Sequence, residues 1–106
     1  MRPLPTDLVI IPKMSIKTIE ILRMSTDTFL IKDPKEVSSK FKTIRKQDDV
    51  IDDLNTDVRG RLIQLMKNKP HEIERATYLL WVAHNLERIA DRGLNIAERS
   101  MQLVGN

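Results

Sequence analysis

Residues 34–67 read PKEVSSKFKTIRKQDDVIDDLNTDVRGRLIQLMK, and the spacing of their apolar side chains decides the fold. Apolar residues return at alternating intervals of four and three, which places them on one side of an α-helix. The stretch also begins as helices do, because Asp33 can cap it, Pro34 suits the first turn and Glu36 can complete a capping box. Gly60 does not interrupt the pattern. The nine positions of this seam are Val37, Phe41, Ile44, Asp48, Ile51, Asn55, Val58, Leu62 and Leu65.

Prolines mark the limits of two further helices. A proline disfavours helix at the residue before it and is tolerated in a first turn, so Pro12 predicts the start of the first helix. NKPH, residues 68–71, is a second break. The expected segments are an extended lead-in over residues 1–11 and helices over about 12–31, 34–67 and 70–104. Long helices with short connections predict an all-α, antiparallel, up-down-up three-helix bundle that forms a single domain over residues 1–106.

The composition excludes several classes of function. The 106 residues include no cysteine, which excludes a disulfide framework, a thiolate metal site and a cysteine nucleophile. A net charge of +3, from 18 basic and 15 acidic residues, does not indicate a nucleic-acid partner. The apolar runs are too short to cross a bilayer and do not resemble a secretory signal. We therefore expect a cytoplasmic domain without a transmembrane segment.

The third helix is expected to contact a neighbour on each of two sides, because it has two apolar seams. The first seam is Ile73, Ala76, Leu80, Ala83, Glu87, Ala90, Leu94, Ala97 and Met101. The second seam is Leu79, Val82, Leu86, Ile89, Gly93, Ile96 and Leu103. In the first helix, the residues that we expect to pack are Ile19, Leu22, Thr26 and Phe29.

Carboxylates interrupt the facing seams of the second and third helices. Asp48 and Asp52 are four residues apart on one helix. Glu87 and Asp91 are four residues apart on the other. This spacing puts each pair on one face of its helix. Both pairs lie about 20 residues from the turn near residue 69, so antiparallel helices of equal rise place them at the same height.

Four carboxylates at one level repel each other and are costly to desolvate, so they need compensation. Arg45, Arg88 and Arg92 could pair with them. The alternative is a hard cation such as Fe, Mn, Mg or Ca, held by oxygen ligands. A di-iron oxidase would need Glu-x-x-His on two helices, whereas only His84 lies near these acids. The residues leave salt-bridged acids and a metal site open, and they disfavour an enzyme.

A polar, basic stripe also follows the third helix at intervals of four and three. It consists of Trp81, Asn85, Arg88, Arg92, Asn95, Arg99 and Gln102. An ordinary solvated face is the simplest interpretation. A contact surface for an acidic partner or a phosphate-bearing ligand is the alternative.

Three segments resemble the PhoU family of phosphate-uptake regulators. LERIADRGLNIAE, residues 86–98, is similar to the end of a PhoU repeat, which reads Leu-Glu-Arg-Ile-(Gly/Ala)-Asp-x-x-x-Asn-Ile-Ala-Glu. QDDVIDDLN, residues 47–55, resembles the acid-rich partner motif, and DLVIIPKM, residues 7–14, resembles the stretch that opens a repeat. The resemblance covers nearly the whole chain and implies a single three-helix PhoU repeat.

The resemblance also implies a metal site. In metal-loaded members of the family, the acid-x-x-x-Asp motifs bind iron or zinc clusters. Carried over by position, the expected metal ligands are Asp48, Asp52, Glu87 and Asp91. Weaker outer candidates are Asp49 and Glu98. Arg92 stands where histidine is common in the family, so pairing of this arginine with an acid remains the competing expectation.

The function that the resemblance implies is non-enzymatic regulation of phosphate transport and phosphate-starvation signalling. The implied partners are the ATPase subunit of an ATP-binding-cassette phosphate importer and a phosphate-sensing histidine kinase. The alternatives are a metal-free helical protein-interaction module and a cytoplasmic regulatory domain of a phosphate transporter. Family members usually carry two bundles in tandem, so we expect this single bundle to pair with a second repeat or with another copy of itself.

Overall fold

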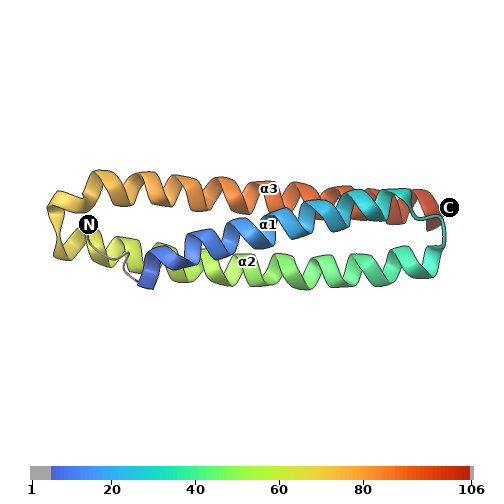
Figure 1. Cartoon of the computed structure of the whole chain (residues 1–106), viewed down its shortest axis with the longest axis horizontal. Coiled ribbons are helices and arrows are strands. Elements are labelled where there is room, and N and C mark those ends of the chain that lie inside the picture. The colour runs from blue at the N-terminus through green and yellow to red at the C-terminus, as the bar shows by residue number, and fades with distance from the viewer. Residues whose placement is uncertain (1–5, 106) are drawn as a thin grey trace.

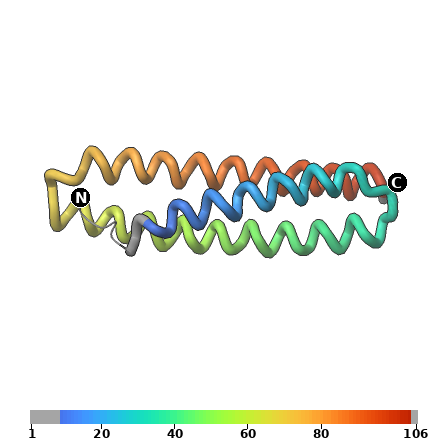
Figure 2. Tube along the Cα trace, viewed as in Figure 1, coloured from blue at the N-terminus to red at the C-terminus, as the bar shows by residue number. Residues whose placement is uncertain are grey.

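The computed structural model describes the backbone of residues 6–105 and the side chains of residues 9–104. Helix α1 spans Thr6–Leu30, α2 spans Pro34–Asn68 and α3 spans Ile73–Gly105, with the short 3-10 helix η1, Pro70–Glu72, leading into α3. The helices lie side by side along a rod of 55 × 21 × 16 Å, and their two connections lie at opposite ends (Figure 1; Figure 2). The all-α, up-down-up bundle is confirmed.

The start and the course of α2 follow the sequence prediction. Asp33 caps the helix, because its carboxylate accepts a hydrogen bond from the backbone N–H of Lys35 at 3.1 Å, and Pro34 lies in the first turn. Gly60 lies within the helix, and a Cβ added to it would have no neighbouring atom within 4 Å outside the local helix backbone. Seven of the nine seam positions are buried, namely Val37, Ile44, Asp48, Ile51, Asn55, Val58 and Leu62.

The predicted lead-in over residues 1–11 is wrong where the structure describes it. We expected an extended segment and a helix from residue 12, but α1 begins at Thr6 and contains Pro12. Residues 1–5 lie outside the described part of the chain. The expected helix over 12–31 therefore begins six residues earlier and ends one residue sooner, at Leu30.

Packing explains why the helix continues through Pro12. Proline has no N–H to donate and weakens a helix interior. The ring of Pro12 is exposed, however, while Ile11 and Met14 on the inner side of the same turns are buried. Most helical stability in proteins comes from burying such an apolar side, so this burial outweighs one lost hydrogen bond.

Helix α3 contacts both other helices, as predicted, but the two seams do not pack along their whole length. Ile73 of the first seam and Ile89, Ile96 and Leu103 of the second are between 39% and 56% exposed. Four alanines at intervals of seven are fully buried along it: Ala76, Ala83, Ala90 and Ala97. On the side toward α1, a Cβ added at Gly93 would lie only 2.8 Å from Cγ2 of Ile21. Helix α1 therefore packs directly against the backbone of α3 at this glycine.

The side of α1 that packs is not the expected one. Ile19 and Phe29 are 52% and 55% exposed, Thr26 is exposed, and only Leu22 of the predicted set is partly buried. The buried row lies one position away and consists of Met14, Thr18, Ile21, Ser25 and Thr28. Small hydroxyl side chains fit the close approach at Gly93, so they take the inner positions although other residues of α1 are more apolar.

Candidate metal centre

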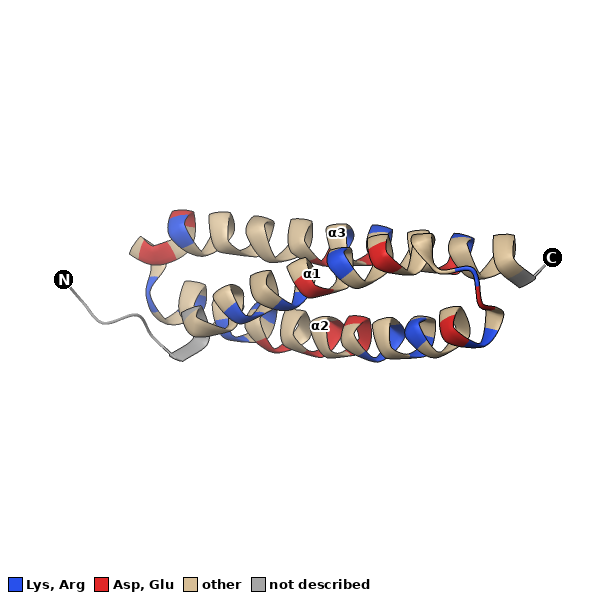
Figure 3. Cartoon of the chain, turned by 45° about the vertical axis from the view of Figure 1, so that its right-hand side comes forward, with Lys and Arg blue, Asp and Glu red and all other residues tan. Residues whose placement is uncertain are grey.

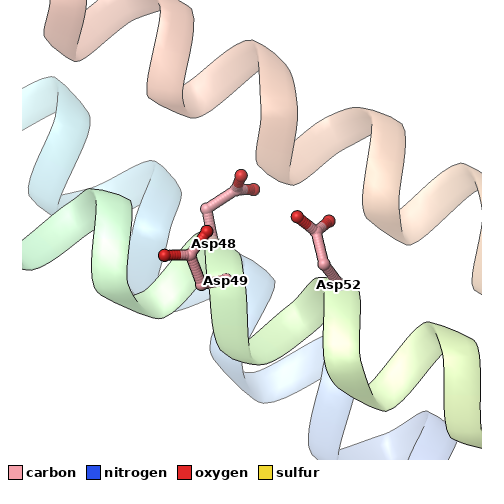
Figure 4. A group of neighbouring side chains, drawn as sticks. All are labelled: Asp48, Asp49 and Asp52. Atoms are coloured by element: carbon pink, nitrogen blue, oxygen red, sulfur yellow. The ribbon is translucent and has the colours of Figure 1, made fainter.

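The carboxyl group of Asp48 lies inside the bundle, between α2 and α3. Asp48 occupies a seam position of α2, so the helix directs its side chain inward, and it is only 8% exposed. Its Oδ1 is buried and has no hydrogen-bond partner. Asp52, one turn later and exposed, directs its carboxylate toward α3 as well, whereas Asp49 points aside (Figure 4).

Burial and like charge both oppose ionisation of these acids. Burial is the largest of the causes that raise the pKa of Asp48 from 3.8 to about 6. The further causes, in decreasing order, are the negative charges of Asp52, Asp91, Asp49 and Glu87. The pKa of Asp52 is raised in the same direction, first by partial burial and next by the charge of Glu87. The acids of α3 therefore lie close enough to raise the pKa values of the acids of α2.

The order of these influences agrees with the predicted heights of the two acid pairs, Asp48/Asp52 and Glu87/Asp91. The charge of Asp91 acts on Asp48 more strongly than the charge of Glu87 does. On Asp52, the charge of Glu87 acts more strongly than the charge of Asp91. This order agrees with two antiparallel helices in matched register, in which Asp48 is level with Asp91 and Asp52 with Glu87.

Asn55 orients one of the four acids. Its Nδ2 donates a hydrogen bond of 2.7 Å to Oε2 of Glu87, and its own Oδ1 is buried without a partner. Sequence reasoning placed Asn55 in the seam of α2 but missed this contact. The available signal was its position, since a polar residue in an apolar seam needs a partner on the facing helix.

The closest carboxylates belong to one helix. Ligand atoms of Asp48, Asp49 and Asp52 all lie within 4.8 Å of one another. Within residues 9–104, no group of three so close includes Glu87 or Asp91. Asp49, expected only as an outer candidate, is thus nearer to the centre than predicted, while the other outer candidate, Glu98, is exposed. The structure places the two predicted pairs at one level but does not draw all four carboxylates together.

Basic side chains do not compensate the acid pairs. Among the described residues, no lysine or arginine nitrogen lies within 4.0 Å of a carboxylate oxygen of either pair. Arg45, Arg88 and Arg92, the competing partners, are all exposed. An arginine–carboxylate contact does form further along α2, between Arg61 and Asp57 at 3.0 Å.

The donor chemistry fits a hard cation. Carboxylate oxygens suit Fe, Mn, Mg or Ca, and zinc also accepts them. A cation at this level would neutralise the like charges and would give Oδ1 of Asp48 the partner that no side chain supplies. His84, one turn before Glu87, is exposed in a surface groove with Arg59, Leu80 and Trp81, so nitrogen ligation is at most marginal.

Comparison with known proteins points to one family. Residues 11–100 match the family model described as PhoU domain. The chain is 36% identical over 94 residues to "Phosphate-specific transport system accessory protein PhoU homolog 2" of Thermotoga maritima, which covers 89% of this chain and 38% of that relative. No solved structure matches the chain.

Two further relatives have the same kind of name, "Phosphate-specific transport system accessory protein PhoU homolog". The one from Rhizobium meliloti is 35% identical over 77 residues, 73% of this chain and 31% of the relative. The one from Zymomonas mobilis is 30% identical over 89 residues, 84% of this chain and 36% of the relative. The chain therefore spans between 31% and 38% of the length of these three relatives.

Proposed function

Because the chain belongs to the PhoU family, we propose that it is a non-enzymatic regulatory domain of a phosphate transport system that binds a metal centre through its two acid pairs. The names of its relatives describe accessory proteins of phosphate-specific transport, and they support the regulatory role. The proposed metal centre is supported by the buried, unpartnered carboxyl group of Asp48 and the acids around it. Both parts can be tested separately.

One observation carries the metal proposal. The carboxyl group of Asp48 is buried, its Oδ1 has no partner, and acids of two helices surround it without a basic residue in contact. Leaving such a group uncompensated costs about 1–3 kcal/mol or more. The proposed ligands are Asp48, Asp52, Glu87 and Asp91, with Asp49 as an outer ligand. Iron or zinc is the expected metal.

Two of the proposed ligands, Asp48 and Glu87, have distinct roles. Asp48 forms the inner wall of the site, and it must lose its proton before it can bind a cation, since only carboxylates are ligands. Glu87 is oriented by Asn55, which binds one of its oxygens and leaves the other free. A cation shared between the pairs would connect α2 to α3, so metal binding would stabilise the bundle by mass action.

The partners and the location follow the family resemblance. We propose that the domain acts on the ATPase subunit of a phosphate importer and on a phosphate-sensing histidine kinase, on the cytoplasmic side. None of the described helices has the length and apolar character needed to span a membrane.

Metal content and metal-dependent stability test the proposed site. The chain is purified without chelator or affinity metal and titrated with Fe²⁺, Zn²⁺ or Mn²⁺, and bound metal is measured by mass spectrometry of the element. We expect the wild type to bind metal at pH 7.5 and to lose affinity below about pH 6, where Asp48 takes up a proton. At a free metal concentration 100 times Kd, the free energy of unfolding should rise by about 2.7 kcal/mol.

Substitutions in the two pairs provide the matched comparison. Asp52→Asn and Asp91→Asn should each reduce affinity at least about tenfold, because each removes a charged ligand. Asp57→Asn removes one negative charge from α2 outside the acid pairs, so this variant should bind metal as the wild type does. Equal trace occupancy in all four proteins would overturn the metal proposal and would leave the family assignment intact.

A metal-free interaction module is the second candidate. Tyr78 and Trp81 are 64% and 65% exposed on the outer side of α3, which is unusual for aromatic residues and typical of contact surfaces. Thermal unfolding separates the two functions. A chelator should lower the melting temperature of a metal-bound domain, whereas stability that depends on surface charge alone should respond to salt.

A further inference from the structure

The hydroxyl group of Thr18 is an exception among the threonines of the helices. In most of those whose side chains the structure describes, the hydroxyl donates a hydrogen bond to the backbone oxygen four residues earlier, namely in Thr26, Thr28, Thr43, Thr56 and Thr77. Thr18 is only 2% exposed, and its Oγ1 is buried without a hydrogen-bond partner among the described residues. A buried hydroxyl without a partner is costly, so a threonine that does not bond to its own helix indicates a partner elsewhere.

Thr18 lies at the same level of the bundle as Asp48. Helices α1 and α2 are antiparallel, and Nζ of Lys17 donates a hydrogen bond of 3.4 Å to Oε1 of Gln47, which sets their register. Helical side chains lean toward the N-terminus by about one residue, so Thr18 and Asp48 both reach the level of this hydrogen bond. They lean toward each other, whereas Ile44, the other seam residue near this level, leans away.

Helix α3 contributes a small side chain at this level. Gly93 lies beside Ile21 and Leu22 of α1, and the two helices run in the same direction. Three residues before that contact, Thr18 is therefore level with Ala90. Ala90 is fully buried, and alanine fills less of the space between the helices than any other residue with a Cβ. Polar groups beside a small side chain are the setting in which proteins hold a buried water molecule.

The chemistry of the two groups also suits a water molecule. Charged residues lie along the whole of α2 (Figure 3), but within its described length Asp48 alone among them is buried. Its Oδ1 and Oγ1 of Thr18 both lack a partner, so the two groups do not bond to each other directly. A carboxylate can only accept hydrogen bonds, and a hydroxyl can donate one. Water can accept from the hydroxyl and donate to the carboxylate.

We propose that one buried water molecule binds between Thr18 and Asp48, and that Thr18 thereby positions the carboxyl group of Asp48 from α1. The hydroxyl of Thr18 donates to the water, and the water donates to Oδ1 of Asp48. An oxygen of a carboxylate has two lone pairs, so Oδ1 keeps one for a cation. The water is neutral and leaves the negative charges of the acid pairs in place. All three helices then contribute to the acid level.

The water and the metal can be tested apart. The water site does not need a metal, whereas positioning of a metal ligand by Thr18 rests on the proposed function. Removing a group that holds a metal ligand in place typically costs about 10–100-fold in metal affinity. Stability and hydration of the metal-free chain therefore test the water, and metal affinity tests the positioning.

Thr18→Val tests the water in the metal-free chain, because valine keeps the shape of threonine and removes the hydroxyl. If the water binds as proposed, the substitution leaves Oδ1 of Asp48 without its partner. The equilibrium constant for folding, measured by urea unfolding at pH 7, should then fall by about threefold to tenfold. A hydroxyl without any partner would give the opposite sign, since valine would remove a costly buried group. A variant as stable as the wild type, or more stable, would overturn the water site.

Ser25→Ala is the matched control. Oγ of Ser25 is also buried without a partner among the described residues, but by the same register its neighbours are Phe41 and Ala97, which are not polar. Removing this hydroxyl should not lower the equilibrium constant for folding, and an equal loss in the two variants would overturn the link to Asp48. Relaxation dispersion of water oxygen-17 counts long-lived internal waters. Thr18→Val should hold one fewer than the wild type, and equal counts would overturn the proposal.

Titration with Zn²⁺ tests the positioning. Thr18→Val should weaken zinc binding at least about tenfold, whereas Thr18→Ser keeps the hydroxyl and should bind within about threefold of the wild type. Equal affinity of the valine variant and the wild type would overturn the positioning role alone. A wild type that binds no metal would overturn the metal centre together with that role, and the water site would still be decided by the metal-free measurements.

Discussion

The two sides of α3 pack in different ways, with carboxylates toward α2 and a glycine toward α1. Toward α2, the helix contributes Glu87 and Asp91 to a level of carboxylates, where Asp48 is buried with one unpaired oxygen. Toward α1, it contributes Gly93, which lets Ile21 approach its backbone. The contact with α2 lowers the free energy of unfolding, because it holds the carboxyl group of Asp48 between the helices with one oxygen unpartnered. The second, with α1, is a close contact of the kind that stabilises a fold.

This difference teaches where function is located in a small bundle. A three-helix domain of about 100 residues has about 5–15 kcal/mol of net stability, so it can accept a costly group in one contact only if other contacts compensate. The close α1–α3 contact at Gly93 contributes to that compensation. The acid level between α2 and α3 is therefore the place where a bound partner can change the free energy of unfolding most.

The largest expected effect lies in the α1–α3 contact. Ile21 is fully buried, so Ile21→Ala should lower the free energy of unfolding by about 2–4 kcal/mol through lost burial and the cavity left behind. The measurement is urea unfolding at low micromolar concentration. Ile19→Ala is the control, because Ile19 is 52% exposed and should cost less than about 1 kcal/mol. Equal losses would mean that the buried row of α1 is packed no more tightly than the row predicted from the sequence.

The buried carboxyl group of Asp48 should produce the next largest effect, a pH dependence of the free energy of unfolding. The pKa of Asp48 is about 6 in the folded chain against 3.8 when unfolded, so the folded state binds the proton more tightly. Stability must then be highest below about pH 4 and fall as pH rises to about 6, by up to about 3 kcal/mol, since one pKa unit is worth about 1.4 kcal/mol. Asp48→Asn should remove most of this fall and raise the stability at pH 7.

Urea midpoints of metal-free protein between pH 4 and 7.5 measure this effect. Asp57→Asn removes a carboxylate of the same helix outside the acid pairs, so it should keep the pH dependence of the wild type. The raised pKa of Asp52 adds a smaller slope of the same sign, which Asp48→Asn should leave in place. A wild type that becomes more stable between pH 4 and 6 would contradict the burial of Asp48 beside like charges.

The contrast between the two sides of α3 also explains which features could be predicted from the sequence. The seam of α2 was predictable because its apolar residues repeat regularly, and even its polar members, Asp48 and Asn55, are buried where the repeat requires. The two acid pairs were predictable for the same reason, since helical rise alone sets their heights. The hydrogen bond between Asn55 and Glu87 was not, because it depends on side-chain rotamers and not on helix period.

Helix α1 was harder to predict because two of its rows compete. Ile19 and Phe29 are more hydrophobic than Thr18 and Ser25, so hydrophobicity alone selects the wrong row. The buried row is set by the shape of α3, which has a glycine where α1 crosses it. The start of α1 failed for a related reason, since tertiary burial of Ile11 outweighs the local effect of Pro12. Both errors occur where tertiary contacts override local preference.

The smallest effect compares two glycines in helices. Gly60 has open space where a Cβ would lie, so Gly60→Ala should stabilise the chain by about 0.5–1 kcal/mol through higher helix propensity. Gly93→Ala gains the same propensity but forces Cβ against Ile21, and overpacking should leave a net loss of about 1 kcal/mol. Combining Gly93→Ala with Ile21→Ala removes the clashing Cγ2, so in that background the alanine should no longer destabilise. Urea unfolding of the four proteins in this cycle measures the coupling. Strict additivity would mean that α1 can move away from α3 at no cost, and that the close contact is not what stabilises this side of the bundle.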